Sequence, residues 1–178
     1  MRIISGKYRG MNLAEFKGNE IRPTADRVKE SLFNILSEKT FGARVLDLFC
    51  GSGNLGIESI SRGADFVHFN DISKDSVSVL KKNLSRLKDN NFAVTVQDYS
   101  LCLSRVKGFD LIFIDPPYAK DFGVGALEII GGEKILNEDG IAVLERDRSF
   151  SGEISGLEEY DERKYGRVYL TFFRGVNL

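Results

Sequence analysis

Apolar positions along this chain alternate between short continuous runs and stripes with helical spacing. Runs at 45–49, 66–70 and 92–97 predict strands. The segments between them, after Gly53 and at 74–88, predict helices, because apolar residues recur there every three or four positions. Together these elements predict a βαβαβ unit with parallel strands.

The second half of the chain continues this alternation and then departs from it. The nearly continuous apolar run at 109–114 predicts a central strand buried on both faces, and a helix at 122–131 and a strand at 141–145 follow it. The segments 157–164 and 167–173 are too close together for a crossover helix, so they should pair as an antiparallel hairpin. The predicted class is α/β, with a mostly parallel sheet and an antiparallel edge.

Two segments precede this alternating core. Residues 2–5 and 11–15 predict short strands around a glycine-flanked turn. Thr24 can cap a helix at 25–38, which carries an apolar stripe suited to packing on a core. Since 178 residues fit a single core, we divide the chain into a β-hairpin appendage at 1–20 and one domain at 21–178.

Composition and charge narrow the function classes. Lys and Arg number 25 against 26 Asp and Glu, a net charge of −1, so any site for a polyanion must be local. Two cysteines and one histidine offer neither a disulfide framework nor zinc spacing, which predicts a reducing compartment and no metal. The chain lacks a signal-peptide pattern and an apolar run of about 18 residues. We therefore expect a cytoplasmic protein that does not span a membrane.

A glycine loop stands at the first strand-to-helix junction. Gly51, Gly53 and Gly56 satisfy the G-x-G-x-x-G fingerprint, and Asp71, at the end of the next strand, could bind the ribose hydroxyls of either NAD or S-adenosylmethionine. Asp47 favours S-adenosylmethionine, because a carboxylate there would repel a pyrophosphate but suits a methionyl ammonium. A tight turn without a ligand is the alternative.

Two more carboxylates end strands at the same sheet edge. Asp98 could accept a hydrogen bond from an adenine amino group, or lie in a surface turn. Asp115-Pro116-Pro117-Tyr118 suits the methylation of a base amine, a poor nucleophile whose lone pair is delocalised. The Asp115 carboxylate and the Pro116 carbonyl could hold its N–H groups, the prolines fix the backbone, and Tyr118 could stack on an extruded base. A rigid turn after a strand is the alternative.

Four segments give the chain a family resemblance. They are Met1-Arg-Ile-Ile-Ser-Gly6 with Tyr8-Arg-Gly10, the block 22–34 (RPTADRVKESLFN), the block 46–58 (LDLFCGSGNLGIE), and Asp115–Tyr118. Here the chain resembles the RsmD-like methyltransferases, class I S-adenosylmethionine-dependent enzymes that methylate the exocyclic N2 of a guanine in 16S ribosomal RNA. The similarity covers nearly the whole chain, and the block 22–34 is its narrowest motif.

This resemblance implies a Rossmann-like sheet of order 3-2-1-4-5-7-6 and catalysis at Asp115–Tyr118. Relatives often carry Glu and, two residues later, Asp after the second strand, whereas Asp71 and Ser73 stand here, so the ribose contact would rest on a shorter side chain. The implied cofactor contacts are Asp47, Phe49, Gly51, Ser52, Gly53, Asp71, Ile72, Asp98 and Tyr99, with Arg22 and Thr24 near the methionyl end.

The expected substrate follows from charge and size. Residues 1–30 hold seven basic and four acidic groups, and Lys7, Arg9 and Arg27 are candidate RNA contacts, although a solvated face is the alternative. Without a separate RNA-binding domain, we expect specificity to come from a folded ribosomal particle, and the resemblance implies 16S rRNA in an assembled or assembling small ribosomal subunit. We expect the protein to be a monomer. The nearest rival is an adenine-N6 methyltransferase acting on DNA or RNA. An NAD-linked oxidoreductase would need an acid or base that we do not find, and a non-catalytic RNA-binding module would leave Asp115–Tyr118 unexplained.

Overall fold

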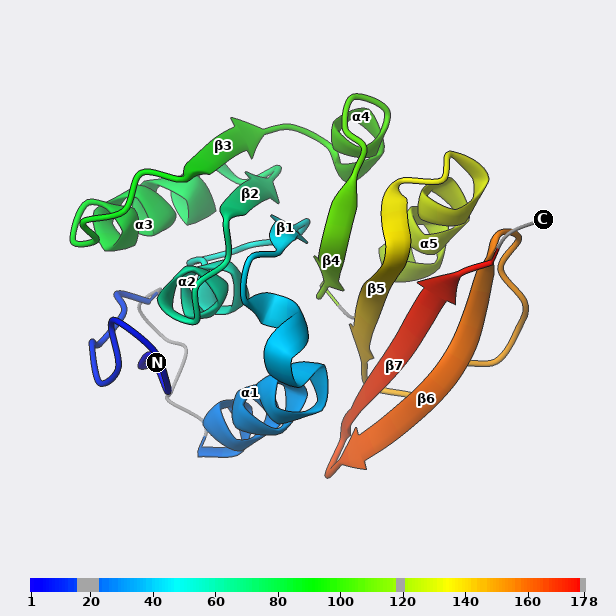
Figure 1. Cartoon of the computed structure of the whole chain (residues 1–178), viewed down its shortest axis with the longest axis horizontal. Helices are drawn as coiled ribbons and strands as arrows, with labels where there is room; N and C mark the ends of the chain where they lie inside the picture. The colour runs from blue at the N-terminus through cyan, green and yellow to red at the C-terminus, as the bar shows by residue number, and fades with distance from the viewer. Residues whose placement is uncertain (16–22, 118–120, 177–178) are drawn as a thin grey trace.

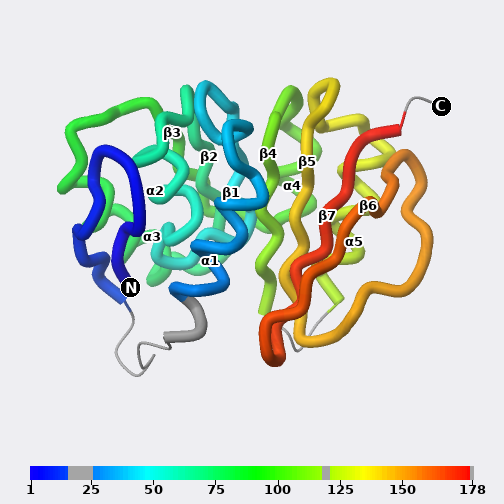
Figure 2. Tube along the Cα trace, turned by 60° about the horizontal axis from the view of Figure 1, so that its bottom comes forward, coloured from blue at the N-terminus to red at the C-terminus, as the bar shows by residue number. Residues whose placement is uncertain are grey.

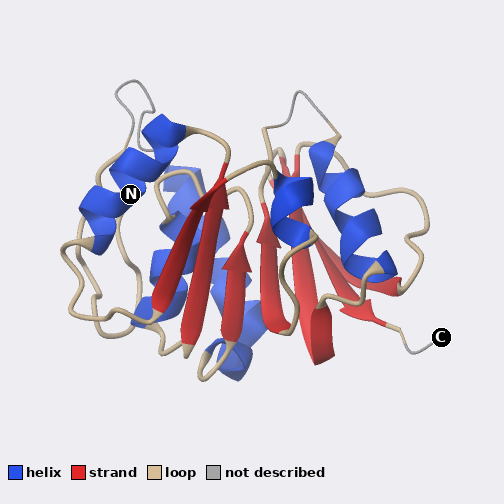
Figure 3. Cartoon of the chain, turned by 90° about the horizontal axis from the view of Figure 1, so that it is seen from above, coloured by secondary structure: helices blue, strands red, loops and turns tan. Residues whose placement is uncertain are grey.

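Seven strands form one sheet, with helices on both of its faces (Figures 1 and 3). The computed structural model describes residues 1–15, 23–117 and 121–176, and only the backbone of 23–25. The strand order is β3-β2-β1-β4-β5-β7-β6, which confirms the expected order. The strands are β1 (Arg44–Asp47), β2 (Phe66–Asp71), β3 (Phe92–Val96), β4 (Phe109–Ile114), β5 (Leu136–Arg146), β6 (Leu157–Tyr165) and β7 (Val168–Gly175).

The first five strands pair in parallel, and β7 pairs antiparallel with both β5 and β6. In Figure 1, α1, α2 and α3 lie on one face of the sheet, and α4 and α5 on the other. The helices are α1 (Pro23–Leu36), α2 (Asn54–Ser61), α3 (Lys74–Leu84), α4 (Tyr99–Leu103) and α5 (Phe122–Gly132), with a 3-10 turn, η1, at Ser37–Thr40. In the part of the chain that the structure describes, no helix is long and apolar enough to cross a membrane.

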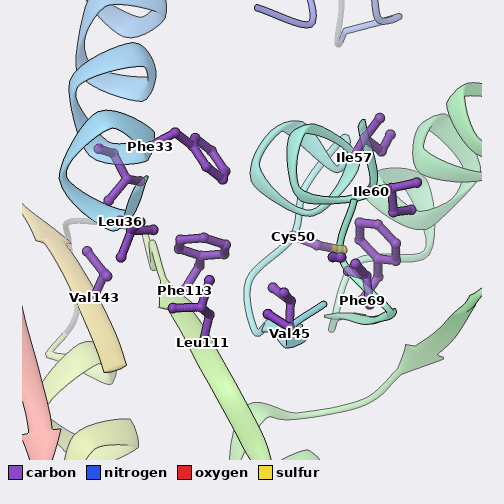
Figure 4. Close-up of a cluster of buried hydrophobic side chains, with 14 of the residues drawn as sticks. Phe33, Leu36, Val45, Cys50, Ile57, Ile60, Phe69, Leu111, Phe113 and Val143 are labelled. Carbon is purple, nitrogen blue, oxygen red and sulfur yellow. The ribbon is translucent and has the colours of Figure 1, made fainter. Parts of the chain in front are cut away.

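Each face of the sheet carries its own apolar core. One core joins α1, α2 and α3 to the sheet, and the other joins α4 and α5 to the opposite face. In Figure 4, Phe33 and Leu36 of α1 lie over Leu111 and Phe113 of β4 and Val143 of β5. The rings of Phe33 and Phe113 have centroids 5.7 Å apart. This packing fixes the orientation of β4 and β5, whose carboxyl ends belong to the candidate site.

Residues 1–15 lie beside α2 and α3 (Figure 2). The backbone N–H groups of Ile4 and Ser5 donate to the carboxylate of Glu58, at 2.9 and 3.0 Å. Glu58 is fully buried, and Lys29 of α1 reaches it with a 3.2 Å ion pair. A buried charge is tolerated when it is paired and hydrogen-bonded, so this cluster ties the N-terminal segment to two helices.

Several element boundaries differ from the sequence-based predictions. The predicted N-terminal strands reduce to one antiparallel bridge between Arg2 and Asn12. Helix α1 begins at Pro23, a residue suited to a first helical position, so Thr24 lies in the first turn and does not cap the helix. Helix α3 ends at Leu84, before the predicted end at 88.

Two elements escaped the apolar pattern. Strand β5 begins at Leu136, before the predicted 141, because polar residues at 137–139 interrupt its apolar run. Helix α4 has only five residues, too few for a periodic stripe, and is capped at its start by Asp98. The division into an appendage and a domain stays a prediction.

Candidate active site

The parallel strands end at one edge of the sheet, where most of the candidate residues lie (Figure 3). The glycine loop leaves β1, Asp71 ends β2, Asp98 follows β3, and Asp115 follows β4. Ligands bind at this edge in open parallel sheets. Tyr118 and Arg22 lie outside the described residues, as does the side chain of Thr24.

The glycine loop is shaped for close approach. Gly53 has φ +88°, and a Cβ there would lie 2.4 Å from Leu80 Cδ1. At Gly56 a Cβ would lie 2.2 Å from the Phe69 ring, so this glycine allows α2 to pack closely against β2. A Cβ on Gly51, in contrast, would meet no atom within 4 Å, so the loop presents bare backbone to open space. Such a cradle fits a ligand that approaches the main chain.

Asp47 lies beneath this loop and is only 3% exposed. Its Oδ2 accepts a hydrogen bond from the Gly56 N–H at 2.9 Å, which fastens the start of α2 to the end of β1. Burial raises the pKa of Asp47 to about 7, the Gly56 hydrogen bond partly opposes this, and the charge of Asp71 adds to it. The proposed contact with a cofactor ammonium stays a prediction, and it would favour the ionised form of Asp47.

Asp71 connects the loop to β2. Its Oδ2 accepts from the Gly51 N–H at 2.9 Å, and its Oδ1 accepts from the Ser73 N–H at 2.8 Å. Each carboxylate oxygen keeps a second lone pair that could accept from a ribose hydroxyl. The next residue, Ile72, is 70% exposed, so a large apolar side chain is accessible at this edge of the sheet.

Asp98 caps α4 and lies near an aromatic row. Its Oδ1 accepts from the N–H and the hydroxyl of Ser100, and these hydrogen bonds lower the pKa of Asp98. The ring of Tyr99 lies 5.5 Å from Phe49 and 5.5 Å from Phe122, measured between centroids. The structure therefore brings Phe49 and Tyr99 together and adds Phe122, which sequence reasoning did not select.

Asn70, in β2, links the ends of β1, β2 and β3. Nothing in the sequence indicated this role, because a lone asparagine inside an apolar strand belongs to no motif. Its Nδ2 donates to the carbonyls of Leu48 and Gln97, both at 3.2 Å, and Asn70 is only 1% exposed. Another buried amide, Asn83 of α3, donates to the carbonyl of Ser52 at 2.9 Å. The two amides thus fix backbone carbonyls just before the glycine loop and within it.

Asp115 and Pro116 continue β4 toward the open edge. Pro116 is buried, whereas Asp115 and Pro117 remain accessible to solvent. Protein atoms around the Asp115 carboxyl still displace part of its solvent, and this raises its pKa. The charges of Glu145 and Asp47 act in the same direction.

A small cavity adjoins Pro116 and is lined by the charged end of β5. Arg146 and Arg148 both pair with Asp121 at the start of α5, at 3.1 and 2.7 Å. The other lining residues are Gly123, Glu145 and Asp147. Sequence reasoning missed these groups because they follow an apolar strand run and form no motif.

The candidate RNA contacts are less concentrated than the sequence suggested. Lys7 pairs with Asp89 at 2.8 Å, and Lys29, another basic group of this region, is buried against Glu58. Arg9 and Arg27 are exposed. The role of Lys7, Arg9 and Arg27 in RNA binding stays a prediction. Within the described residues, no three His, Cys, Asp or Glu side chains are grouped as metal ligands.

Comparison with known proteins gives the family. The family described as Conserved hypothetical protein 95 matches residues 1–174. YlbH of Bacillus subtilis (strain 168) is 39% identical over 153 residues, covering 83% of each chain. Ribosomal RNA small subunit methyltransferase D of Haemophilus influenzae is 35% identical over 153 residues, covering 83% of this chain and 79% of that protein.

A solved structure agrees with this assignment. That of yhhF from Escherichia coli has a TM-score of 0.88 at 28% identity, and the match covers 98% of this chain and 97% of that one. The class I methyltransferase fold is thereby confirmed, as is the resemblance that the motifs indicated. The chain belongs to the family of Conserved hypothetical protein 95, the RsmD-like S-adenosylmethionine-dependent methyltransferases.

Proposed function

We propose that this protein methylates the exocyclic N2 amine of a guanine in 16S ribosomal RNA. The observation that carries the proposal is the position of Asp115-Pro116, at the same sheet edge as the open face of the glycine loop. A base amine held there by a carboxylate and a carbonyl would stand beside the methyl donor. The small-subunit rRNA named in the Haemophilus influenzae relative supports the choice of nucleic acid.

The residues at the edge fit S-adenosylmethionine by their chemistry. When bound, this cofactor supplies a methyl group activated by its sulfonium. Asp71 would accept from the ribose hydroxyls, Ile72 and Tyr99 would pack on the adenine, and Asp47 in its ionised form would face the ammonium. Bare backbone at Gly51 would let the cofactor lie close to the loop.

On the substrate side, Asp115 would hold the amine. Its carboxylate would accept one N–H of the base and the Pro116 carbonyl the other, which favours a pyramidal amine with a free lone pair. We expect Tyr118 to stack on the extruded base. Replacing Asp115 with Ala should therefore lower the transfer rate about 100-fold while adenosylhomocysteine affinity stays within a few-fold. An equal loss of both would assign Asp115 to cofactor binding or to the fold.

The cofactor assignment has a separate test. In Asp71→Ala, adenosylhomocysteine binding measured by calorimetry should weaken by about 1–3 kcal/mol, the range for a lost hydrogen bond to a charged group. Ser78→Ala, at an exposed position of α3, is the matched control and should bind normally. Tight NAD binding without adenosylhomocysteine binding would reverse the assignment.

We infer a structured RNA target from charge and size. A net charge of −1 gives little attraction for long RNA, and several basic groups near the N-terminus are already paired. The protein should therefore act as a cytoplasmic monomer on an assembled or assembling small ribosomal subunit, whose shape provides specificity.

Tritiated methyl transfer tests the substrate directly. We would compare small subunits from a strain lacking the enzyme, naked 16S rRNA and duplex DNA, using the wild-type protein and Asp115→Ala. Wild-type protein should label the small subunits most efficiently, at guanine, and the variant should label them about 100-fold more slowly. Labelling of duplex DNA at adenine, with the ribosomal substrates unlabelled, would refute the proposal.

A further inference from the structure

Two carboxylates stand side by side where the candidate active site meets the middle of the sheet. Strands β4 and β5 are parallel neighbours, and Ile114 is in register with Leu144. The residues that follow this pair are Asp115 and Glu145. Asp115 is the first residue beyond β4, and Glu145 lies within β5, so the register of the preceding pair places the two residues next to each other.

The alternation of side chains places both carboxylates on the same face. Leu111 and Phe113 of β4 belong to the core beneath α1, as do Ile141 and Val143 of β5, and Figure 4 shows three of them facing that helix. Side chains at every second strand position share a face. Asp115 and Glu145 each follow two residues after these apolar positions, so they continue the same face toward the open edge.

Other charged groups define the surroundings of this pair. Asp47 of β1 lies on the neighbouring strand and also acts on Asp115. Arg146, the residue after Glu145, forms an ion pair with Asp121, and Arg148 pairs with the same carboxylate. Asp147 lines the same cavity and pairs with Arg148 at 3.6 Å. Asp121 therefore pairs with both arginines.

We propose that Glu145 acts through Asp115 as a positioning residue, making Asp115 the acceptor of the proton that the base amine releases. The inference rests on the proposed function. During transfer the amine lone pair forms the N–C bond, and the C–S electron pair stays on sulfur. One N–H bond then breaks, its electrons remain on nitrogen, and its proton passes to the Asp115 carboxylate and later to water.

The physical reason is the repulsion between like charges. Two neighbouring carboxylates resist simultaneous ionisation, which raises the proton affinity of one of them. Partial desolvation of the Asp115 carboxyl raises its pKa, and the charge of Glu145 acts in the same direction. A stronger proton acceptor at the amine assists proton loss at neutral pH. Glu145 would not need to touch the substrate.

The pH dependence of methyl transfer tests this role. Activity in the wild-type protein should rise with pH as Asp115 ionises. In Glu145→Gln this rise, the acid limb of the pH profile, should have its midpoint about one pH unit or more lower, because the repelling charge is gone. Glu138→Gln, at an exposed position on the same strand, is the matched control and should leave the limb in place. An unshifted limb in Glu145→Gln, or an equal shift in Glu138→Gln, would overturn the proposal.

A second measurement needs neither substrate nor a variant. Carbon-13 NMR titration of the full chain should show Asp115 and Glu145 titrating in two coupled steps, each responding to the ionisation of the other. Independent single-step curves would overturn the proposal even if Glu145→Gln failed to fold. The two hypotheses remain separable: coupled titration without methylation of small subunits would refute the proposed function alone, and methylation with independent titration would refute the role of Glu145 alone.

Discussion

Replacing Asp47 with Asn should stabilise the cofactor-free protein at alkaline pH. The Asp47 carboxyl is 3% exposed, and its pKa lies at about 7 against an ordinary value of 3.8. The folded protein therefore holds a proton that the unfolded chain has already released between about pH 4 and 7. The stability that this proton contributes is fully present below pH 4 and is lost as the pH rises through about 7.

The magnitude follows from the difference in pKa. About three pH units, at about 1.4 kcal/mol each, give an upper limit of roughly 4 kcal/mol between pH 4 and pH 8. Asparagine resembles the protonated acid and can still accept the hydrogen bond from Gly56 N–H. Asp47→Asn should therefore lie within about 1 kcal/mol of the wild-type protein near pH 4.5, and exceed its free energy of unfolding by about 2–4 kcal/mol at pH 8.

Urea unfolding at several pH values, without cofactor, measures this difference directly. Adenosylhomocysteine affinity provides a second measurement, because an ionised Asp47 facing the ammonium should bind more tightly than the neutral amide. Parallel stability curves for the two proteins from pH 4.5 to 8 would refute the burial argument. Unchanged adenosylhomocysteine affinity in Asp47→Asn would refute the ammonium contact.

Two further substitutions test the packing around the site. Gly56→Ala should lower the free energy of unfolding by about 1–3 kcal/mol, because the new Cβ would lie 2.2 Å from the Phe69 ring; Gly132→Ala, which meets nothing within 4 Å, should change it little in the same urea titration. Lys29→Met should cost about 3 kcal/mol, since Glu58 would lose a buried partner, and a thermal midpoint equal to that of the wild-type protein would contradict this.

The apolar pattern sufficed for the order and class of most elements, because sheet faces and helix stripes impose distinct periods on the sequence. It failed where an element is too short or too polar to show a period. Helix α4 depends on the cap made by Asp98, and the first part of β5 contains Asn137, which bonds to Asp110 of β4 at 2.7 Å. The contact between Asn137 and Asp110 joins residues that are distant in sequence.

In the candidate site, too, some features could be predicted from the sequence and others could not. Asp47 and Asp71 could be selected from spacing alone, yet their hydrogen bonds to Gly56 and Gly51 depend on how the loop closes. Glu145 could not be selected from the sequence, because it only ends an apolar run. Its place beside Asp115 depends on the register of β4 and β5. Motifs therefore point to candidate ligand contacts more readily than to the residues that hold those candidates in place.

Nucleoside mapping of ribosomal RNA shows whether this protein methylates a guanine of 16S rRNA. RNA from cells with and without this protein would be digested and analysed by mass spectrometry, with complementation by wild-type protein or Asp115→Ala. In cells that lack the protein, N2-methylguanine should disappear from one position of 16S rRNA. It should return with the wild-type protein and not with the variant. Unchanged guanine methylation in 16S rRNA, or a loss of N6-methyladenine instead, would contradict the proposed function.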